Sequence, residues 1–217
     1  MSRVKRGIYI TVPLEAKYPS DRREEPWIVA ATVFKPGYMG GWTACEHWGL
    51  TDQIFSDIVV FTTRRVRSRK QVIQNTTFII KVVSSKKMTG LKNVWINNVQ
   101  VNVSDPSHTI ADILANPHLG GGIRHVADVL EEYFGNKHRN DAALTEYVKL
   151  NGNRTAAKRL GYLLETMEIR APEVIRFCQK YKSTGYSKLD PKITLKGRLL
   201  RRWNLEINAR IEKKDTF

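Results

Sequence analysis

Two aspartates have the residue type and the position that metal-dependent hydrolysis would need. Asp105 directly follows a stretch in which Val99, Val101 and Val103 alternate with polar residues, which is the period of a strand with one buried face. A carboxylate at the end of a strand can bind Mg²⁺, with Asp112 as a second acid nearby. No strand with a closely spaced acidic residue and lysine follows, however, so the pattern of a nuclease site is incomplete.

Asp105 also has a sufficient structural role. It stands directly before Pro106, so its carboxylate can cap a helix whose first residue is the proline. Ile110, Ile113 and Leu114 would give that helix a short apolar stripe. We therefore expect Asp105 to be a helix cap and keep the nuclease as an alternative.

The other candidate ligands and nucleophiles are scattered. His118 and His125 are separated by Gly120–Gly122, which interrupts the helical pattern, so they are not expected to share a helix face. Cys45 and His47 alternate within a predicted helix and would point to different faces. The glycines lack the Lys-Ser or Lys-Thr that follows in a phosphate-binding P-loop. We expect no catalytic residue, no metal site and no cofactor.

Cysteine usage and hydropathy indicate a cytoplasmic protein. Cys45 and Cys178 are too few for a disulfide framework or a cysteine zinc site, and their apolar helical surroundings predict buried free thiols. No apolar run reaches membrane-spanning length, and no N-terminal hydrophobic block resembles a secretion signal. We expect a cytoplasmic location and no membrane partner.

Positive charge is the strongest compositional signal. The chain has 217 residues and a formal net charge of +15, and residues 58–104 contain nine Lys or Arg and no Asp or Glu. Such charge favours polyanions, nucleic acid first, because arginine binds phosphate with its forked donors. A solvated charged loop is the alternative. The candidate nucleic-acid-binding residues are Arg64, Arg65, Arg67, Arg69, Lys70, Lys86, Lys87, Lys196, Arg198, Arg201 and Arg202.

The hydrophobic pattern predicts mostly strands up to residue 104. Trp95 and Trp203 alternate with polar neighbours, so both are interpreted as core residues and not as base-stacking platforms. Asn97-Asn98 is a tight-turn signal that joins 94–96 to 99–101 as a hairpin. The other expected elements are a strand over 4–12 with Gly7 at a turn, a linker over 13–26, a helix over 24–34 with Trp27, Ala30, Ala31 and Phe34 buried, a short helix from Trp42 or Thr43 that Gly49 ends, and strands over 57–63 and 77–83.

After residue 104 the pattern becomes helical. Expected are helices from Pro106, from the glycine break to Phe134, from a cap at Asp141, from Asn153 or Thr155 and from Pro172, and then a final strand over 203–207. The sequence therefore predicts an α+β fold: a mixed, largely antiparallel central sheet with flanking helices and a helical C-terminal third. Which ends of the sheet carry the basic segments is left open, because that depends on strand pairing.

Several short segments follow one another in an order that resembles a known family. They are Gly37-Tyr38, Ala44, Gly49-Leu50-Thr51 and Gln53, then the strand with Asp105-Pro106, Thr109, Ile110 and Asp112 before the glycine break, then Arg159-Leu160-Gly161, Leu189-Asp190-Pro191 and Trp203 to Asn208. Their order and spacing resemble the AbiEi antitoxins, regulators of abortive-infection toxin–antitoxin pairs. Cys45, where leucine is usual, and Trp48 depart from the family pattern.

The resemblance implies an organisation and a function. Arg6-Gly7-Ile8-Tyr9 is similar to the exit of the family's winged helix-turn-helix, so we expect a remnant wing strand and linker over 1–20 and an AbiEi-like C-terminal domain over 21–217. The family's function would make the protein an antitoxin that represses its own operon at inverted repeats of promoter DNA. It would also neutralise a nucleotidyltransferase-type toxin, with or without a stable complex, and would not be an enzyme. The alternatives are a restriction-endonuclease-like nuclease and a basic RNA-binding module.

Overall fold

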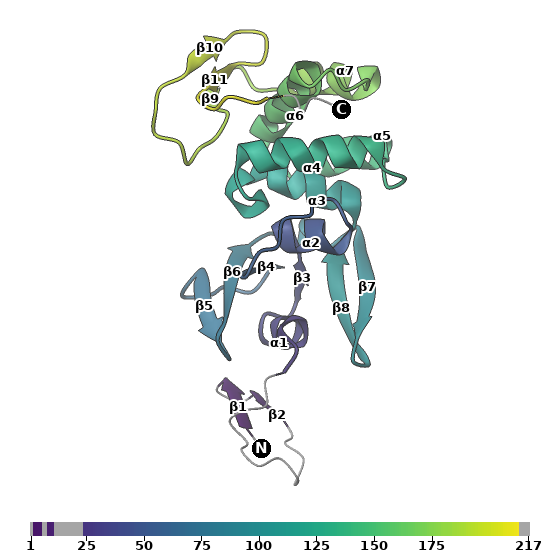
Figure 1. The fold of residues 1–217 in the computed structure, drawn as a ribbon, viewed down its shortest axis with the longest axis vertical. Coiled ribbons are helices and arrows are strands. Elements are labelled where there is room, and N and C mark those ends of the chain that lie inside the picture. The colour runs from purple at the N-terminus through teal and green to yellow at the C-terminus, as the bar shows by residue number, and fades with distance from the viewer. Residues whose placement is uncertain (1, 6–7, 11–23, 213–217) are drawn as a thin grey trace. The chain divides into compact units, whose positions relative to one another are not determined.

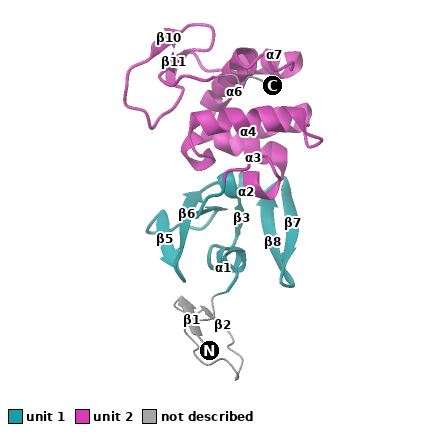
Figure 2. Cartoon of the chain, in the orientation of Figure 1, with its two compact units in different colours: residues 1–43, 54–104 teal, residues 44–53, 105–217 magenta. Residues whose placement is uncertain are grey.

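The computed structural model describes residues 2–5, 8–10 and 24–212, which form two compact units (Figure 2). Unit 1 comprises residues 1–43 and 54–104, and unit 2 comprises residues 44–53 and 105–217. The predicted linker over 13–26 lies mostly outside the described residues, as does Gly7. The predicted N-terminal strand is two short antiparallel strands, β1 (Ser2–Lys5) and β2 (Ile8–Ile10). No helix in the described part of the chain is long and apolar enough to cross a membrane.

Unit 1 is built on a six-stranded sheet with the strand order β5-β6-β4-β3-β8-β7 (Figure 1). Three of its neighbouring pairs are antiparallel, while β4 with β6 and β3 with β8 are parallel. This sheet and the helices confirm the predicted α+β fold with a mixed, largely antiparallel sheet. The strands are β3 (Gly37–Met39), β4 (Ile58–Thr62), β5 (Lys70–Ile73), β6 (Thr76–Val82), β7 (Leu91–Ile96) and β8 (Val99–Ser104).

Helix α1 (Pro26–Val33) contributes to the core of unit 1. It buries Val29, Ala30 and Val33, and the following Phe34 packs on Phe78 of β6 with 5.6 Å between ring centroids. The prediction that Trp27 and Ala31 are buried here is wrong, because both side chains are only half-buried. The helix is rotated relative to the predicted apolar stripe, so that its valines take the core positions.

The hairpin of β7 and β8 confirms the turn predicted from Asn97-Asn98. Both asparagines have positive φ, +44° and +66°, as a two-residue hairpin turn requires. The register pairs Ile96 with Val99 and continues along the strands to Leu91 with Ser104. The prediction that Trp95 lies in the core is wrong: its side chain is 66% exposed.

Unit 2 is mostly helical, which confirms the predicted helical C-terminal third. A three-stranded sheet with the order β10-β11-β9 completes it. Its elements are α3 (Pro106–Ala115), α4 (Ile123–Gly135), α5 (Asp141–Leu150), α6 (Arg154–Thr166), α7 (Pro172–Tyr181), β9 (Ser187–Lys188), β10 (Arg198–Leu200) and β11 (Leu205–Ile207), while α2 (Gly41–His47) runs from unit 1 into unit 2.

Asp105 caps α3, as its place before Pro106 predicts. Its Oδ1 accepts the backbone N–H of His108 at 2.8 Å, and its Oδ2 accepts the Tyr147 hydroxyl at 2.8 Å. Burial, and then the bond to Asp105, raises the pKa of Tyr147, so the hydroxyl stays a donor. Both oxygens of the carboxylate are therefore engaged in structural hydrogen bonds.

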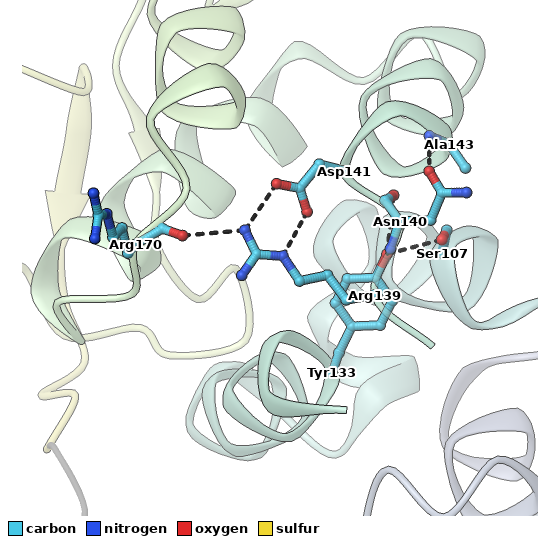
Figure 3. Close-up of polar contacts among 7 residues, drawn as sticks. All are labelled: Ser107, Tyr133, Arg139, Asn140, Asp141, Ala143 and Arg170. Atoms are coloured by element: carbon cyan, nitrogen blue, oxygen red, sulfur yellow. Dashed lines mark hydrogen bonds and ion pairs between the residues drawn. The ribbon is translucent and has the colours of Figure 1, made fainter. Parts of the chain in front are cut away.

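The cap of α5 is one residue earlier than predicted (Figure 3). Asn140 accepts the N–H of Ala143 at 3.0 Å, whereas the predicted cap, Asp141, is the first helical residue. Asp141 instead forms a two-bond ion pair with Arg139, at 2.8 and 2.9 Å. An acid in the first turn still favours the helix through the helix dipole.

Two buried cations of α6 hold the C-terminal strands of unit 2. Arg159 is 4% exposed and donates to the carbonyls of Leu189 at 2.8 Å and Leu114 at 2.9 Å. Burial lowers the pKa of Arg159 to about 10. The Lys158 ammonium donates to the Gly185 carbonyl and to Ser187 Oγ, and burial lowers its pKa. These bonds replace the water that a buried charge loses.

We predict that Asp105→Ala lowers the free energy of unfolding by about 1–2 kcal/mol, because it removes the cap of α3 and the acceptor of Tyr147. Asp105→Asn is the matched control, since asparagine caps nearly as well. Chemical denaturation of the three proteins gives the comparison. Suppose instead that Asp105→Ala keeps full stability and abolishes a Mg²⁺-dependent activity. Asp105 would then be a metal ligand and not a cap.

Candidate nucleic-acid interface

The pairing of the strands shows which end of the sheet carries each basic segment. Because β4 and β6 are parallel, their C-terminal ends meet at one edge, where Thr62 pairs with Val82. Residues 64–69 leave that end of β4, and residues 85–87 follow that end of β6. The chain must pass the end of β6 to reach β5, so the arginine-bearing loop lies across it. We call this edge of unit 1 the basic edge.

The arginine loop, residues 64–69, is tied to its surroundings by backbone bonds. The Ile80 N–H donates to the Arg69 carbonyl at 2.7 Å, and the Arg64 N–H donates to Thr62 Oγ1 at 3.0 Å. The Arg64 guanidinium also donates to the Val33 carbonyl at the end of α1, at 3.3 Å. Only Val66 in the loop is apolar, and it is half-buried. The loop is therefore anchored through its backbone and through the Arg64 guanidinium, while all four arginine side chains stay exposed.

The four arginines of the loop, Arg64, Arg65, Arg67 and Arg69, are exposed. Among the described residues none of them has a carboxylate within ion-pair distance, whereas Lys70 pairs with Asp57 at 3.8 Å. That pair lies at the surface and contributes little to stability. Arginines without a carboxylate partner are suited to phosphate contacts, because an arginine already paired with an acid would have to give up that partner.

The two lysines of the next turn differ. Lys86 is exposed at the basic edge, but Lys87 is 9% exposed and its ammonium lies 6.0 Å from the centre of the Phe61 ring. Lys87 therefore belongs to the packing of unit 1 and adds little to the charged surface. Lys35 is a cation of this edge that sequence reasoning missed: it is exposed beside Pro36, whose carbonyl accepts the N–H of Thr63. Lys35 is far from the arginine loop along the chain, so the sequence does not indicate that the two lie at the same edge.

A pocket of about 340 Å³ lies between the end of α1 and the arginine loop. The side chains of the loop form one wall, and the last residues of α1 form the other. Its lining residues are Val33, Phe34, Arg64, Arg65, Val66, Arg67, Ser68 and Gln71. A lining that combines apolar residues with arginines suits a flat or aliphatic group that carries negative charge.

The C-terminal candidates belong to unit 2 and form a separate set. Lys196, Arg198 and Arg201 are exposed on and around β10. Arg202 forms a two-bond ion pair with Glu165, with Nε 2.8 Å from Oε2, and this bond lowers the pKa of Glu165. Arg202 is thus engaged by an acid, whereas the arginine loop of unit 1 is not.

The residues considered for catalysis have structural contacts. His125 Nε2 lies 2.8 Å from Thr51 Oγ1, and its Nδ1 lies 2.7 Å from the Gly120 carbonyl. Cys45 and Cys178 are buried free thiols, as predicted, and burial raises the pKa of both, that of Cys178 to about 12. Among the described residues, no group of three or more His, Cys, Asp or Glu side chains could hold a metal ion.

The chain matches no protein-family model and no curated protein. Its fold is similar to that of a solved structure, the RV2827C protein from Mycobacterium tuberculosis, with a TM-score of 0.59 and 12% sequence identity. The similarity covers 84% of this chain and 68% of the other. At this identity the likeness shows a shared fold, and function has to be argued from the surface itself.

We predict that replacing all four arginines of the loop by serine changes the free energy of unfolding by no more than about 0.5 kcal/mol, because their side chains are exposed and the bond from Arg64 to the Val33 carbonyl, at 3.3 Å, is long. Lys87→Ser is the contrasting variant: it removes a buried side chain and should cost about 1 kcal/mol or more. Thermal and chemical unfolding measure both. A large loss of stability in the arginine variant would make the loop part of the packing of unit 1.

Proposed function

We propose that this protein is a DNA-binding antitoxin-type regulator whose basic edge contacts the phosphate backbone of promoter DNA. The observation that carries the proposal is the arginine loop: four exposed arginines, without a carboxylate partner among the described residues, gathered with Lys35 and Lys86 at one edge of a sheet. Cations placed this way neutralise phosphates and release counterions. Contacts of this kind position a protein on DNA and carry no sequence information themselves.

The regulatory part of the proposal rests on the resemblance to the AbiEi antitoxins. By that resemblance the protein would repress its own operon at inverted repeats and neutralise a nucleotidyltransferase-type toxin in the cytoplasm. An enzymatic role has less support, because both oxygens of Asp105 are held by a backbone N–H and by Tyr147. No step of the proposed function requires a metal or a cofactor.

We predict that the protein binds duplex DNA with an affinity that falls steeply as salt rises. Replacing the four loop arginines by serine should weaken binding and flatten the salt dependence by roughly one unit of slope for each phosphate that the variant no longer neutralises. Titration of labelled duplexes at several salt concentrations measures both quantities. As a matched control, Lys196, Arg198 and Arg201 are replaced by serine, which changes a similar charge in unit 2.

Equal losses of affinity in the arginine-loop variant and in the unit 2 variant would mean that net charge alone drives binding. If neither variant changes affinity or slope, the basic edge is not the DNA-binding surface.

The antitoxin part has its own test. Co-expression of this protein should restore the growth of cells that express the toxin encoded beside it, and the Asp105→Asn variant, which keeps its cap, should rescue equally well. Failure of rescue at equal protein level, with DNA binding intact, would leave a DNA-binding protein that is not an antitoxin.

A further inference from the structure

Trp95 is an exposed aromatic side chain whose nearest neighbours on its face of the hairpin are polar. It is 66% exposed, whereas Trp27, Trp42 and Trp48 are half-buried and Trp203 is fully buried. An indole ring that is exposed in this way offers a flat surface on which a planar ligand can stack.

The neighbours of Trp95 on the hairpin are uncharged carboxamides. The register places Gln100 directly opposite Trp95, and the next pair on the same face is Asn93 with Asn102. Gln100 and Asn93 are exposed, and the turn adds Asn97 and Asn98. Carboxamides both donate and accept hydrogen bonds, which suits the edges of nucleobases.

The basic edge lies level with this pair. Val103 pairs with Met39, and Met39 pairs with Val60. Gln100 is three residues before Val103, so the same three-residue step, back along β3 and forward along β4, places it level with Pro36 and Thr63. Thr63 directly precedes the arginine loop. Strand β8 is two positions from β4 in the sheet and β7 is three, which places Gln100 about 10 Å and Trp95 about 14 Å across the sheet from the end of β4, where the loop begins. Figure 1 shows the closed end of this hairpin beyond the start of β3, next to α1.

Strand alternation also places positive charge on the face that bears Trp95. Following the same register, Lys81 of β6 and Lys70 of β5 share this face of the sheet. Lys70 has a side chain that is 67% exposed and pairs with Asp57 at 3.8 Å, a surface contact that is weak. The middle of the face is covered, since Tyr38 and Phe61 are buried there. Phosphates would therefore follow the basic edge while the bases reach the hairpin.

We propose that the outward face of the β7–β8 hairpin, centred on Trp95, is a stacking site for an unpaired base of a single-stranded nucleic acid whose phosphates run along the basic edge. An indole ring stacks on any exposed base, and an unpaired base leaves its hydrogen-bonding edge free for Gln100 and Asn93. Bases in a duplex are already stacked and paired, so they gain little from Trp95. The inference rests on the proposed function only for the phosphate contacts.

The test compares single strands with a duplex. Labelled oligothymidylate, labelled oligouridylate and a labelled duplex of equal length are titrated with the full chain and with Trp95→Ala. The variant should lose about 5- to 150-fold in affinity for the single strands, the usual effect of one stacked base, and keep its affinity for the duplex. Val72→Ala is the matched control, because Val72 is 65% exposed on the same face of edge strand β5 and should change neither affinity.

A second readout follows the ring itself. Binding of oligothymidylate should quench tryptophan fluorescence in the wild type, and Trp95→Phe should lose that quenching while keeping part of the affinity. Equal affinity for the two oligonucleotides means that the site contacts base and phosphate but does not distinguish DNA from RNA. Tighter binding of oligouridylate assigns the ligand as RNA.

The outcomes separate this inference from the proposed function. If Trp95→Ala lowers the affinity for single strands and for the duplex equally, or changes neither affinity, the stacking site is overturned while the DNA-binding proposal stands. Binding of the duplex without binding of single strands has the same consequence. Failure of the wild type to bind any nucleic acid overturns both.

Discussion

The parallel pairing of β4 with β6 is the constraint on which the basic edge depends. Five consecutive pairs, from Ile58 with Phe78 to Thr62 with Val82, fix the direction of the two strands. A parallel pair cannot be joined by a tight turn, so the connecting chain must leave at one edge and return through β5. Loop residues 64–69 lie in that connection. Had β4 and β6 been antiparallel neighbours, residues 64–69 and 85–87 would lie at opposite edges.

Features that depend on neighbouring residues were predictable from the sequence. The Asn97-Asn98 turn, the Asp105 cap and the end of the short helix at Gly49, which has a φ of +64°, each rest on local backbone chemistry, and the structure confirms them. The error at Asp141 is of one residue, because Asn140 and Asp141 are both good caps and the sequence does not rank them.

Features that depend on distant pairing were not predictable. The alternation around Trp95 is that of a half-buried strand, but it does not tell which face is covered: the structure buries the face of Val101 and Val103 and leaves the face of Trp95 exposed. The candidate site was also predictable only in part. The charge of the arginine loop was visible in the sequence, whereas the burial of Lys87 and the position of Lys35 at the same edge depend on the strand pairing of the sheet. Lys158 and Arg159 show a similar limit, since a basic pair in a helix is typical of a surface and here lies in the core of unit 2.

The segment from β4 to β8 carries ionisable side chains of one sign only. Residues 58–104 contain no Asp, Glu, His, Cys or Tyr, so lysine and arginine are the only ionisable side chains there. The segment therefore supplies no acid of its own that could neutralise the cations of the basic edge. A surface of this composition responds to ionic strength, through screening. The salt concentration around the protein thus sets how strongly this surface attracts any anion.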